Sequence, residues 1–522
     1  MMGPVRQSDG GHLYDVAIVG AGFGGVGMAL QLVQAGIDDM VIVDRGDGFG
    51  GVWRANCYPG AACDVPSHLY SFSFEQSADW SRKYAPQAEI LTYLAGVATK
   101  HGLDKFLVPR AEVQAARFDE AANTWDVDVR MADAPRAVRR LRARSLIFAC
   151  GQLSQPARCE HIPGLHCGAF RGPVIHTAEW DSAQDLSGKH VAVIGSGASA
   201  IQVVPQLAKS VGSLTHVCRS PAYVFPKDDQ PYSSWWRRAL ARAGNALLSV
   251  SRSKQHAAHE LRGAALLSGL PGSLKLAQNA FARHIKKQIP DPVLRRRMTP
   301  DYRLGCKRIL MSNDYYATLQ QPNVTTVRGE LVDVKEHSIV VSTPSTARSD
   351  AGAPDTAQEQ LEVPVDAIVL ATGFNTSEFL GRIDVRGRSC HALADDWKGG
   401  AVAHLGMTVH GYPNMYVLYG PNTNLAHNSI VHMLEAQQAY VVQCIAEMAA
   451  RGLRALEVKA EAQAIFDEEM QRRLRASVWA TGCSSWYVDA AGRVTHNWPG
   501  LVGEYRKRTR HPNIDRDFIA VR

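Results

Sequence analysis

Short apolar runs alternate with amphipathic stretches along the chain, and in two places the alternation contains a glycine-rich turn. The first place runs from Tyr14 to Gly20, through a helical stretch at 26–36, to a second apolar run at 40–43. The second begins at 187–195 and ends in the apolar run 214–218. Strand, glycine turn, helix and strand in this order are typical of a βαβ unit. The sequence therefore predicts an α/β fold with two Rossmann-like dinucleotide-binding domains.

The first glycine loop, GAGFGG, has its key positions at Gly20, Gly22 and Gly25. These positions allow a tight turn, close approach of the backbone to a pyrophosphate, and close packing of the helix on the strand. The second strand of the unit ends at Asp44, where a carboxylate binds ribose hydroxyls and repels a 2′-phosphate. The first site is therefore predicted to bind FAD or NAD rather than NADP.

The second glycine loop, GSGASA, contains Gly195 and Gly197, and its unit ends at Arg219. Arg219 follows the first glycine of its loop by the same 24 positions that separate Asp44 from Gly20. A cation in this place pairs with a 2′-phosphate, which predicts NADPH as the second nucleotide. An ordinary surface arginine is the alternative interpretation.

The stretch FRGPVIHTAEWD, between the two loops, has too many aromatics for a plain linker. It predicts a joint between the two nucleotide-binding units. We expect the following division: 1–155, first part of the FAD-binding domain; 156–186, the joint; 187–231 with 301–373, the NADPH-binding domain; 232–300, a helical insertion in that domain; 374–522, the return to the FAD-binding domain and the C-terminal region. The polar stretch 343–360 is predicted to be a loop.

Charge is uneven along the chain, whose formal net charge is +7. Residues 232–308 hold sixteen Lys and Arg against three acids. Such an excess suits phosphorylated nucleotides or an anionic membrane surface, but no nucleic-acid motif accompanies it and we expect no nucleic-acid partner. Most of these cations are expected on a solvated helical face. The insertion also has apolar residues that face either a substrate or a core: Trp235, Trp236, Leu247 and Leu248.

Composition indicates a globular protein, with 46% apolar and 20% charged residues. The ten cysteines include no CxxC pair, so we expect them to be reduced and mostly structural, as in a cytoplasmic protein. Cys57 and Cys63, six positions apart, do not match the five-residue spacing of the flavin disulfide reductases. No apolar run is long enough to cross a bilayer, and no signal peptide or metal site is expected.

Two motifs resemble those of the type I Baeyer-Villiger monooxygenases. The pattern FxGxxxHTxxWD is met by Phe170, Gly172, His176, Thr177, Trp180 and Asp181. The pattern GGxWxxxxYPGxxxD is met by Gly50, Gly51, Trp53, Tyr58, Pro59, Gly60 and Asp64. The resemblance covers nearly the whole chain and, through the SSWY stretch, extends to the branch of the 4-hydroxyacetophenone monooxygenases. It implies a monooxygenase that uses FAD, NADPH and O2 to convert a ketone into an ester or lactone, through a peroxide at the flavin C4a atom.

The same resemblance assigns roles to individual residues. It implies that Asp64 is the acid beside the flavin and that Arg308 is the catalytic arginine. Lys307 and Arg219 would hold the 2′-phosphate, Trp486 would cover the nicotinamide nucleotide, Trp53 would line the cofactor site, and His176 would act through the joint. A structural ion pair between loops is the alternative for Asp64 and Arg308. The rival activities are N- or S-oxygenation, which Trp180-Asp181 disfavours, disulfide reduction, and a flavoprotein without catalysis.

Overall fold

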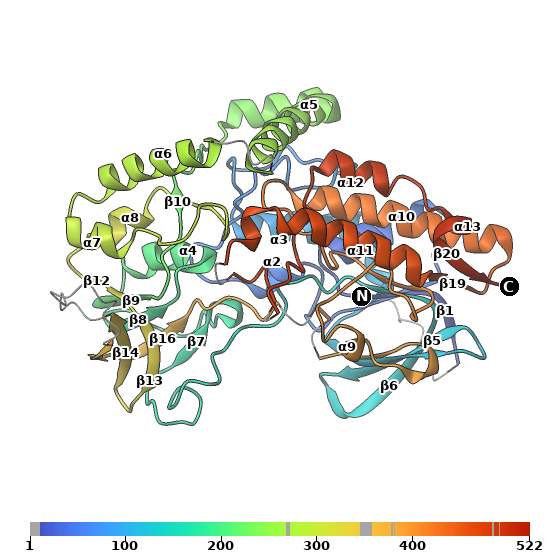
Figure 1. The fold of residues 1–522 in the computed structure, drawn as a ribbon, viewed down its shortest axis with the longest axis horizontal. Coiled ribbons are helices and arrows are strands. Elements are labelled where there is room, and N and C mark those ends of the chain that lie inside the picture. Colours follow the sequence, from blue (N-terminus) through green and yellow to red (C-terminus); the bar gives the residue numbers. More distant parts are fainter. Residues whose placement is uncertain are drawn as a thin grey trace.

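A largely parallel sheet forms the centre of the first lobe in the computed structural model (Figure 1). The structure describes residues 11–267, 272–344, 358–376, 379–380, 382–482, 485–489 and 491–522. The strand order of this sheet is β17-β4-β5-β6-β1-β2-β3, with β18 also paired to β6. The central strands are buried on both faces. One face packs with α1 (Phe23–Gln34) and α10 (Ile430–Arg451), and the other packs with side chains of β4, β5 and the segment 385–417. The strands of this sheet are β1 (Leu13–Val19), β2 (Met40–Val43), β3 (Leu107–Val108), β4 (Ala111–Asp119), β5 (Thr124–Met131), β6 (Ala134–Phe148), β17 (Asp384–Arg386) and β18 (Met415–Val417).

A second parallel sheet, of order β12-β9-β8-β16-β7, forms the other lobe. A three-stranded antiparallel sheet, β13-β14-β15, packs beside it. The strands are β7 (Val174–His176), β8 (His190–Ile194), β9 (Ser213–Cys218), β12 (Val324–Arg328), β13 (Glu330–Val334), β14 (Ser338–Pro344), β15 (Gln358–Pro364) and β16 (Ala367–Leu370). Most of the loop predicted at 343–360 lies outside the described residues. The predicted α/β class with two Rossmann-like units is confirmed.

The chain returns to the first lobe after the second sheet, where β17 and β18 add to the first sheet and α10 packs on α1. The small sheets are β10 (Val224–Phe225) with β11 (Leu310–Met311) and β19 (Ala455–Val458) with β20 (Phe518–Val521). The helices outside the insertion are α1 (Phe23–Gln34), α2 (Val52–Ala55), α3 (Gln87–Lys100), α4 (Ala198–Leu207), α8 (Tyr315–Thr318), α9 (Leu393–Asp396), α10 (Ile430–Arg451), α11 (Ala460–Arg475), α12 (Val502–Arg508) and α13 (Ile514–Asp517). Short 3-10 turns are η1 (Leu103–Phe106), η2 (Thr177–Glu179), η3 (Arg388–Cys390) and η4 (Val478–Ala480).

Three helices form the insertion: α5 (Ser234–Leu267), α6 (Ser273–Gln288) and α7 (Pro292–Arg297). Figure 1 shows α5 at the top of the molecule between the two lobes, and α6 and α7 over the second lobe. α6 packs on the second lobe, where the Phe281 ring contacts the Tyr223 ring at a centroid distance of 4.7 Å. α5 bends at Gly244, whose φ of 65° is not helical. Among the described residues, no helix has the length and apolar character needed to cross a membrane.

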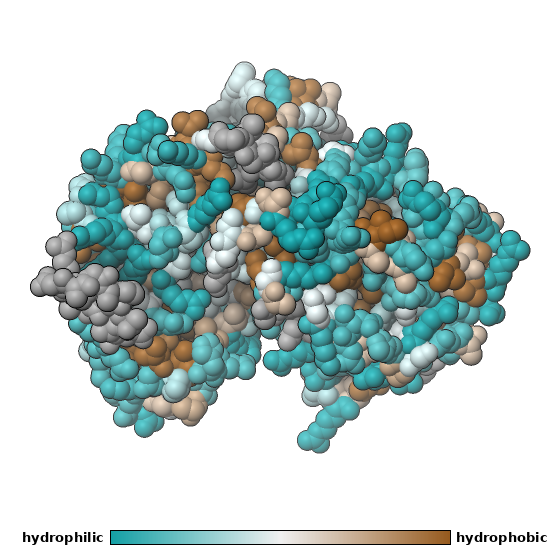
Figure 2. All heavy atoms as spheres, viewed as in Figure 1, coloured by the Kyte–Doolittle hydropathy of each residue, from teal (hydrophilic) through white to brown (hydrophobic). Residues whose placement is uncertain are grey.

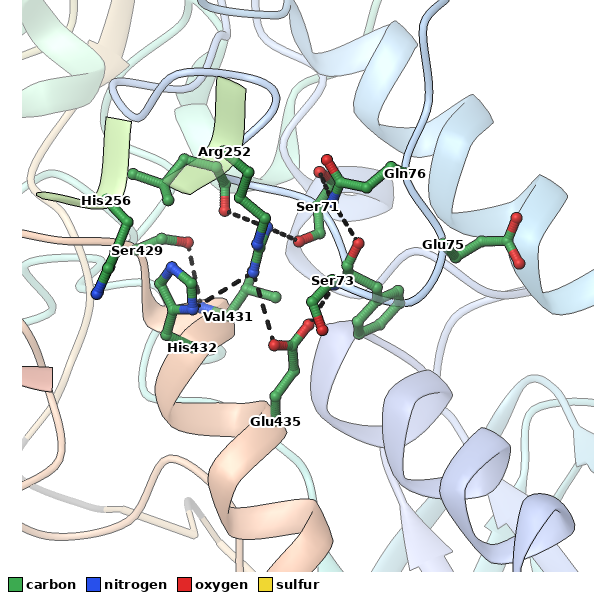
Figure 3. A network of polar contacts seen from close by, with 12 residues as sticks. Ser71, Ser73, Glu75, Gln76, Arg252, His256, Ser429, Val431, His432 and Glu435 are labelled. Carbon is green, nitrogen blue, oxygen red and sulfur yellow. Dashed lines mark hydrogen bonds and ion pairs between the residues drawn. The ribbon is translucent and has the colours of Figure 1, made fainter. Parts of the chain in front are cut away.

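A buried arginine fixes α5 to the first lobe (Figure 3). Arg252 is 6% exposed, and its guanidinium donates to the carbonyl oxygens of His68, Leu69 and Ser71. Its Nη2 lies 3.6 Å from Oε2 of Glu435 on α10. Burial raises the pKa of Glu435 even though Arg252 opposes that shift. The guanidinium therefore compensates a carboxylate that the surrounding protein disfavours.

The redox state of the cysteines differs from the expectation at Cys306. Eight of them carry no disulfide: Cys57, Cys63, Cys150, Cys159, Cys167, Cys218, Cys390 and Cys444. The expectation that all ten are reduced is wrong at Cys306, which is disulfide-bonded. Distances between cysteines along the chain do not reveal which loops meet in the fold, so the sequence gives no sign of this bond.

Replacing Arg252 by Met is expected to lower the free energy of unfolding by about 3–5 kcal/mol, because Glu435 and three carbonyl groups lose a buried partner. Thermal or urea unfolding measures the change. The control is Arg238→Met on the same helix, whose side chain is exposed and whose loss should change stability by under about 0.5 kcal/mol. Equal midpoints for Arg252→Met and the wild type would show that this anchor does not stabilise the fold.

Candidate active site

One cavity of about 1300 Å³ lies between the two lobes. Both glycine loops line it, together with the loop at 50–65, the segment 418–434 and Trp486. A single drug-sized ligand site is smaller than this, at roughly 300–1000 Å³. The cavity has room for more than one ligand, and residues from both βαβ units face it.

The first glycine loop has no space for a side chain at Gly20 or Gly25. Gly20 has a φ of 110°, and a Cβ there would lie 2.5 Å from the carbonyl oxygen of Ala149. A Cβ at Gly25 would lie 1.8 Å from the carbonyl oxygen of Gly20. Gly22 is the N-cap of α1 and supplies no side-chain cap, so the first backbone N–H groups of the helix are left for a phosphate.

Asp44 stands at the end of β2, on the cavity wall. Its Oδ2 accepts a hydrogen bond of 2.6 Å from the Ala21 amide, and its Oδ1 accepts one of 2.7 Å from the Gly46 amide. These bonds fix the carboxylate beside the glycine loop, in the place where a ribose is bound in this fold.

The second glycine loop repeats the geometry of the first. Gly195 has a φ of 125°, and a Cβ there would lie 2.3 Å from the carbonyl oxygen of Ala371. A Cβ at Gly197 would have no atom within 4 Å, and this glycine is the N-cap of α4, again without a side-chain cap. A second helix N-terminus is therefore open toward the same cavity.

Arg219 and Lys307 lie on the cavity wall after β9 and before β11. Nζ of Lys307 donates to Oγ of Ser220 at 3.0 Å, and burial lowers the pKa of this lysine, with Arg219 adding to the shift. Nη1 of Arg219 forms an ion pair of 2.8 Å with Oε1 of Glu330. The sequence analysis missed Glu330, because β13 lies 111 positions further along the chain.

Arg308 and Asp64 meet in the cavity although 244 positions separate them. Nε and Nη2 of Arg308 donate to Oδ2 of Asp64 at 3.0 and 2.5 Å. The side chains remain 38% and 28% exposed. Burial opposes ionisation of Asp64, but Arg308 outweighs it and lowers the pKa of the carboxyl group. The cation and the anion are therefore held together at a surface that a ligand can reach.

Two tyrosines that the sequence analysis did not single out lie near this pair. Tyr419 lines the cavity with a φ of 59°, which is rare for an aromatic residue, and donates from its hydroxyl to Oδ1 of Asn424 at 2.6 Å. Nε2 of Gln152 donates to the Tyr419 carbonyl oxygen and helps to hold the turn. Burial raises the pKa of Tyr487 to about 12, with Arg308 opposing the shift. Burial also raises the pKa of Tyr419, so both phenols are neutral donors at pH 7.

The remaining predicted residues divide into two groups. Trp53 and Trp486 line the cavity, where Nε1 of Trp53 donates to the Tyr70 hydroxyl at 3.2 Å. His176 does not line it: the histidine is 4% exposed at the end of β7, and its Nδ1 accepts from the Ala178 amide. Its ring faces Phe374, a cavity residue, at 6.3 Å. His176 therefore lies one layer behind the cavity.

The insertion residues that were considered as substrate-facing are elsewhere. Trp235, Trp236 and Leu247 are exposed on α5, and Leu248 is buried. None of the four lines the cavity. The substrate interpretation of these residues is not supported by their positions.

The two lobes facing one cavity, each with an open helix N-terminus, define an oxidoreductase of the two-dinucleotide class. Residues 14–260 match the pyridine nucleotide-disulphide oxidoreductase family model. A Baeyer-Villiger monooxygenase of Pseudomonas aeruginosa is 40% identical over 95% of this chain and 89% of its own length, and one of Streptomyces coelicolor is 39% identical over 96% and 91%. The chain belongs to the Baeyer-Villiger monooxygenase family.

Solved structures agree with this assignment. An oxidised steroid monooxygenase bound to NADP superposes with a TM-score of 0.82 at 30% identity, over 98% of this chain and all of the other. Cyclohexanone monooxygenase from Rhodococcus sp. Phi1, bound to NADP+, gives a TM-score of 0.82 at 26% identity, over 98% and 99%. The likeness therefore includes both lobes.

The pair of Asp64 and Arg308 should give stability a defined pH dependence. The folded-state pKa of Asp64 is lowered, so the contribution of the pair is present above the unfolded pKa of about 3.9 and is lost as pH falls through the folded value. Asp64→Asn should lower the unfolding midpoint by roughly one degree at pH 7, since a partly exposed pair contributes under about 1 kcal/mol. Calorimetry should show the difference from wild type shrinking between pH 5 and pH 3. A difference that grows on acidification would contradict this assignment.

Proposed function

We propose that this protein is an FAD- and NADPH-dependent Baeyer-Villiger monooxygenase that inserts one oxygen atom from O2 beside a ketone carbonyl, giving an ester or lactone. The observation that carries the proposal is the contact between Arg308 and Asp64 in the cavity that both glycine loops line. A permanent cation in that place can stabilise negative charge on a reacting oxygen. A nucleotide-binding protein without catalysis would not need it there.

The first lobe fits FAD. Gly20 and Gly25 leave space for backbone alone, so a pyrophosphate can approach the N-terminus of α1, and Asp44 is placed for ribose hydroxyls. Trp53 and Tyr70 contribute aromatic surface to the same wall. The bound flavin would supply hydride acceptance and the activation of O2, and the protein would supply position and charge.

The second lobe fits NADPH. The N-terminus of α4 is open to a pyrophosphate beyond Gly195 and Gly197. Arg219 and Lys307 provide two cations for a 2′-phosphate, and Arg219 would exchange Glu330 for that phosphate on binding. Trp486 lines the cavity from the C-terminal region, where it would cover the nicotinamide nucleotide.

Arg308 would act on the ketone. When the carbonyl carbon is attacked, negative charge develops on the ketone oxygen, and a preorganised guanidinium in a cavity of low dielectric stabilises it. Asp64 would orient the guanidinium through Nε and Nη2, which leaves Nη1 available as a donor. His176, behind Phe374, would be a positioning residue for the joint rather than a group that touches substrate.

The cavity wall near Tyr419 is suited to an apolar ketone. Leu425, Ile430 and Leu434 present aliphatic surface there, and Asn424 and Asn428 add a few polar groups. Apolar lining with a small number of placed polar groups is typical of small-molecule sites. We further propose that the protein is cytoplasmic, with the eight cysteines that carry no disulfide as support.

Arg308→Ala is expected to reduce FAD with NADPH at a nearly normal rate but to form ester at least about a hundredfold more slowly, because the oxyanion loses its charge partner. Anaerobic stopped-flow absorbance measures flavin reduction, and mass spectrometry of a ketone panel measures the gain of one oxygen. Arg303→Ala, an exposed residue off the cavity wall, is the control. Normal ester yield from Arg308→Ala would remove the proposed role. N-oxides or sulfoxides as the products of wild type in place of esters would establish the heteroatom-oxygenating alternative.

Arg219→Ala should raise KM for NADPH about tenfold or more and leave KM for NADH nearly unchanged, because a hydrogen-bonded charge pair contributes roughly 1.5–3 kcal/mol. Glu330→Gln should have the opposite effect and lower KM for NADPH up to about fivefold, since it frees Arg219 from an exposed ion pair worth up to about 1 kcal/mol. Steady-state kinetics with both nucleotides test the two variants. Equal changes for NADH and NADPH would show that Arg219 does not read the 2′-phosphate.

A further inference from the structure

The second part of α5, after the bend at Gly244, turns its polar residues toward the protein. Besides Arg252, Nδ1 of His256 contacts Nδ2 of Asn428 at 3.2 Å, and Nδ1 of His259 lies 2.9 Å from the His427 carbonyl oxygen. Oε1 of Glu260 accepts from Asn428 at 2.8 Å and contacts His427 at 3.2 Å. The helix is therefore attached to the first lobe by several hydrogen bonds and charged contacts, in addition to the buried side chain of Leu248.

Apolar residues occupy the opposite face of this helix and are exposed. Leu247, Val250 and Leu261 are 37%, 47% and 74% exposed. Their spacing of 3 and 11 positions keeps them on one side at 100° per residue, with exposed Lys254 between them. In Figure 2 the upper edge of the molecule, where Figure 1 places α5, shows apolar side chains interspersed with polar ones. An amphipathic helix of a globular protein normally has the reverse arrangement.

The beginning of α5 and the neighbouring helix α6 also have exposed apolar side chains. Trp235 is 68% exposed and its ring lies 6.2 Å from that of Trp236, while Leu276 on α6 is 71% exposed. We name the exposed residues of these two helices the α5 surface: Trp235, Trp236, Leu247, Val250, Leu261 and Leu276 with Arg238, Arg242, Lys254, Arg262 and Lys275.

Charge on the α5 surface is of one sign. The sequence of α5 and α6 holds ten Lys and Arg and a single acid, Glu260, which faces the first lobe. In the described part of the chain, Arg238, Arg242 and Lys254 take part in no ion pair. Nothing within these helices neutralises the exposed cations, so an anionic partner complements them.

We infer that the α5 surface is the site at which this protein docks on an anionic lipid bilayer. Tryptophan and leucine side chains that insert at the headgroup level, flanked by Lys and Arg, are what such an interface binds. A second copy of this chain fits less well, because a twofold contact would bring the same cations face to face. A nucleic acid would pair with the cations but would leave the leucines exposed. The inference does not depend on the proposed function.

Vesicle sedimentation of the full-length protein tests this inference. We expect binding to phosphatidylcholine vesicles that contain phosphatidylglycerol, weaker binding in high salt, and little binding to phosphatidylcholine alone. No binding to anionic vesicles, or equal binding to both kinds, would overturn the inference. Sedimentation velocity without lipid tests whether a second copy of this chain binds the α5 surface instead. If the wild type is a dimer and the apolar triple variant described below is a monomer, the surface serves self-association and the inference is overturned. Tighter binding to duplex DNA than to vesicles would also overturn it.

Two sets of substitutions separate the apolar and the charged contributions. The triple variant Leu247→Gln, Val250→Gln, Leu261→Gln should lower the partition coefficient about tenfold or more in low and in high salt. The triple variant Arg238→Gln, Arg242→Gln, Lys254→Gln should abolish the preference for anionic vesicles, since each cation near such a surface contributes roughly fivefold. Ile465→Gln on α11, at an equally exposed apolar position (70%), is the control and should bind as wild type does.

These residues are exposed and line no part of the cavity, so all variants should keep the wild-type melting temperature and the same NADPH oxidation in vesicle-free buffer. This separates the two proposals, because the oxygenation assay needs no lipid and the vesicle assay needs no substrate. A loss of binding in Ile465→Gln equal to that in the apolar triple variant would show that exposed apolar area in general, rather than the α5 surface, binds the vesicles.

Discussion

The contact between Arg308 and Asp64 depends on both lobes at once. Asp64 follows the first βαβ unit, whereas Arg308 follows the helical insertion of the second, so the pair forms only when the two lobes face each other. The net effect of its surroundings keeps the carboxyl group ionised, because Arg308 outweighs the cost of burial. The pair is partly exposed and contributes little to stability, so the role of the acid is to hold the guanidinium in one orientation. Asp64 thereby fixes the position in which Arg308 meets a substrate.

The glycine loops of the two lobes have the same steric restriction, but the residues that follow their second strands carry opposite charges. Gly20 lies against the Ala149 carbonyl and Gly195 lies against the Ala371 carbonyl, with positive φ in both cases. The equivalent residues at the ends of the second strands are an acid, Asp44, and a cation, Arg219. Identical backbone turns thus present two helix N-termini to one cavity, and a single side chain in each unit sets which nucleotide fits. The backbone turns provide the phosphate sites, and the charge of Asp44 or Arg219 discriminates between nucleotides with and without a 2′-phosphate.

Local pattern was sufficient for the fold because strands, glycine turns and helices are encoded within about thirty residues of each other. Sequence predicted the strand at 40–43 to the residue, since β-branched runs bounded by turns leave little choice. It could not place Glu330 opposite Arg219, or Glu435 opposite Arg252, because those contacts join segments more than a hundred positions apart. The nearness of Asp64 and Arg308 followed from family resemblance alone. Nothing in the sequence indicated the positive φ of Tyr419 except that this residue precedes a Gly-Pro step.

The insertion connects the outer surface of the protein to the wall of the cavity. Asn428 lines the cavity and also donates to Glu260 on α5. Although burial opposes ionisation, hydrogen bonds from His427 and Asn428 lower the pKa of Glu260 to about 2, so the acceptor stays charged at neutral pH. Polar anchors of this kind have strict geometry, whereas apolar packing tolerates sliding. An apolar inner face would have held α5 on the first lobe without fixing the rotation of the helix about its own axis. The polar inner face fixes that rotation, and it is this rotation that presents Leu247, Val250 and Leu261 to the outside.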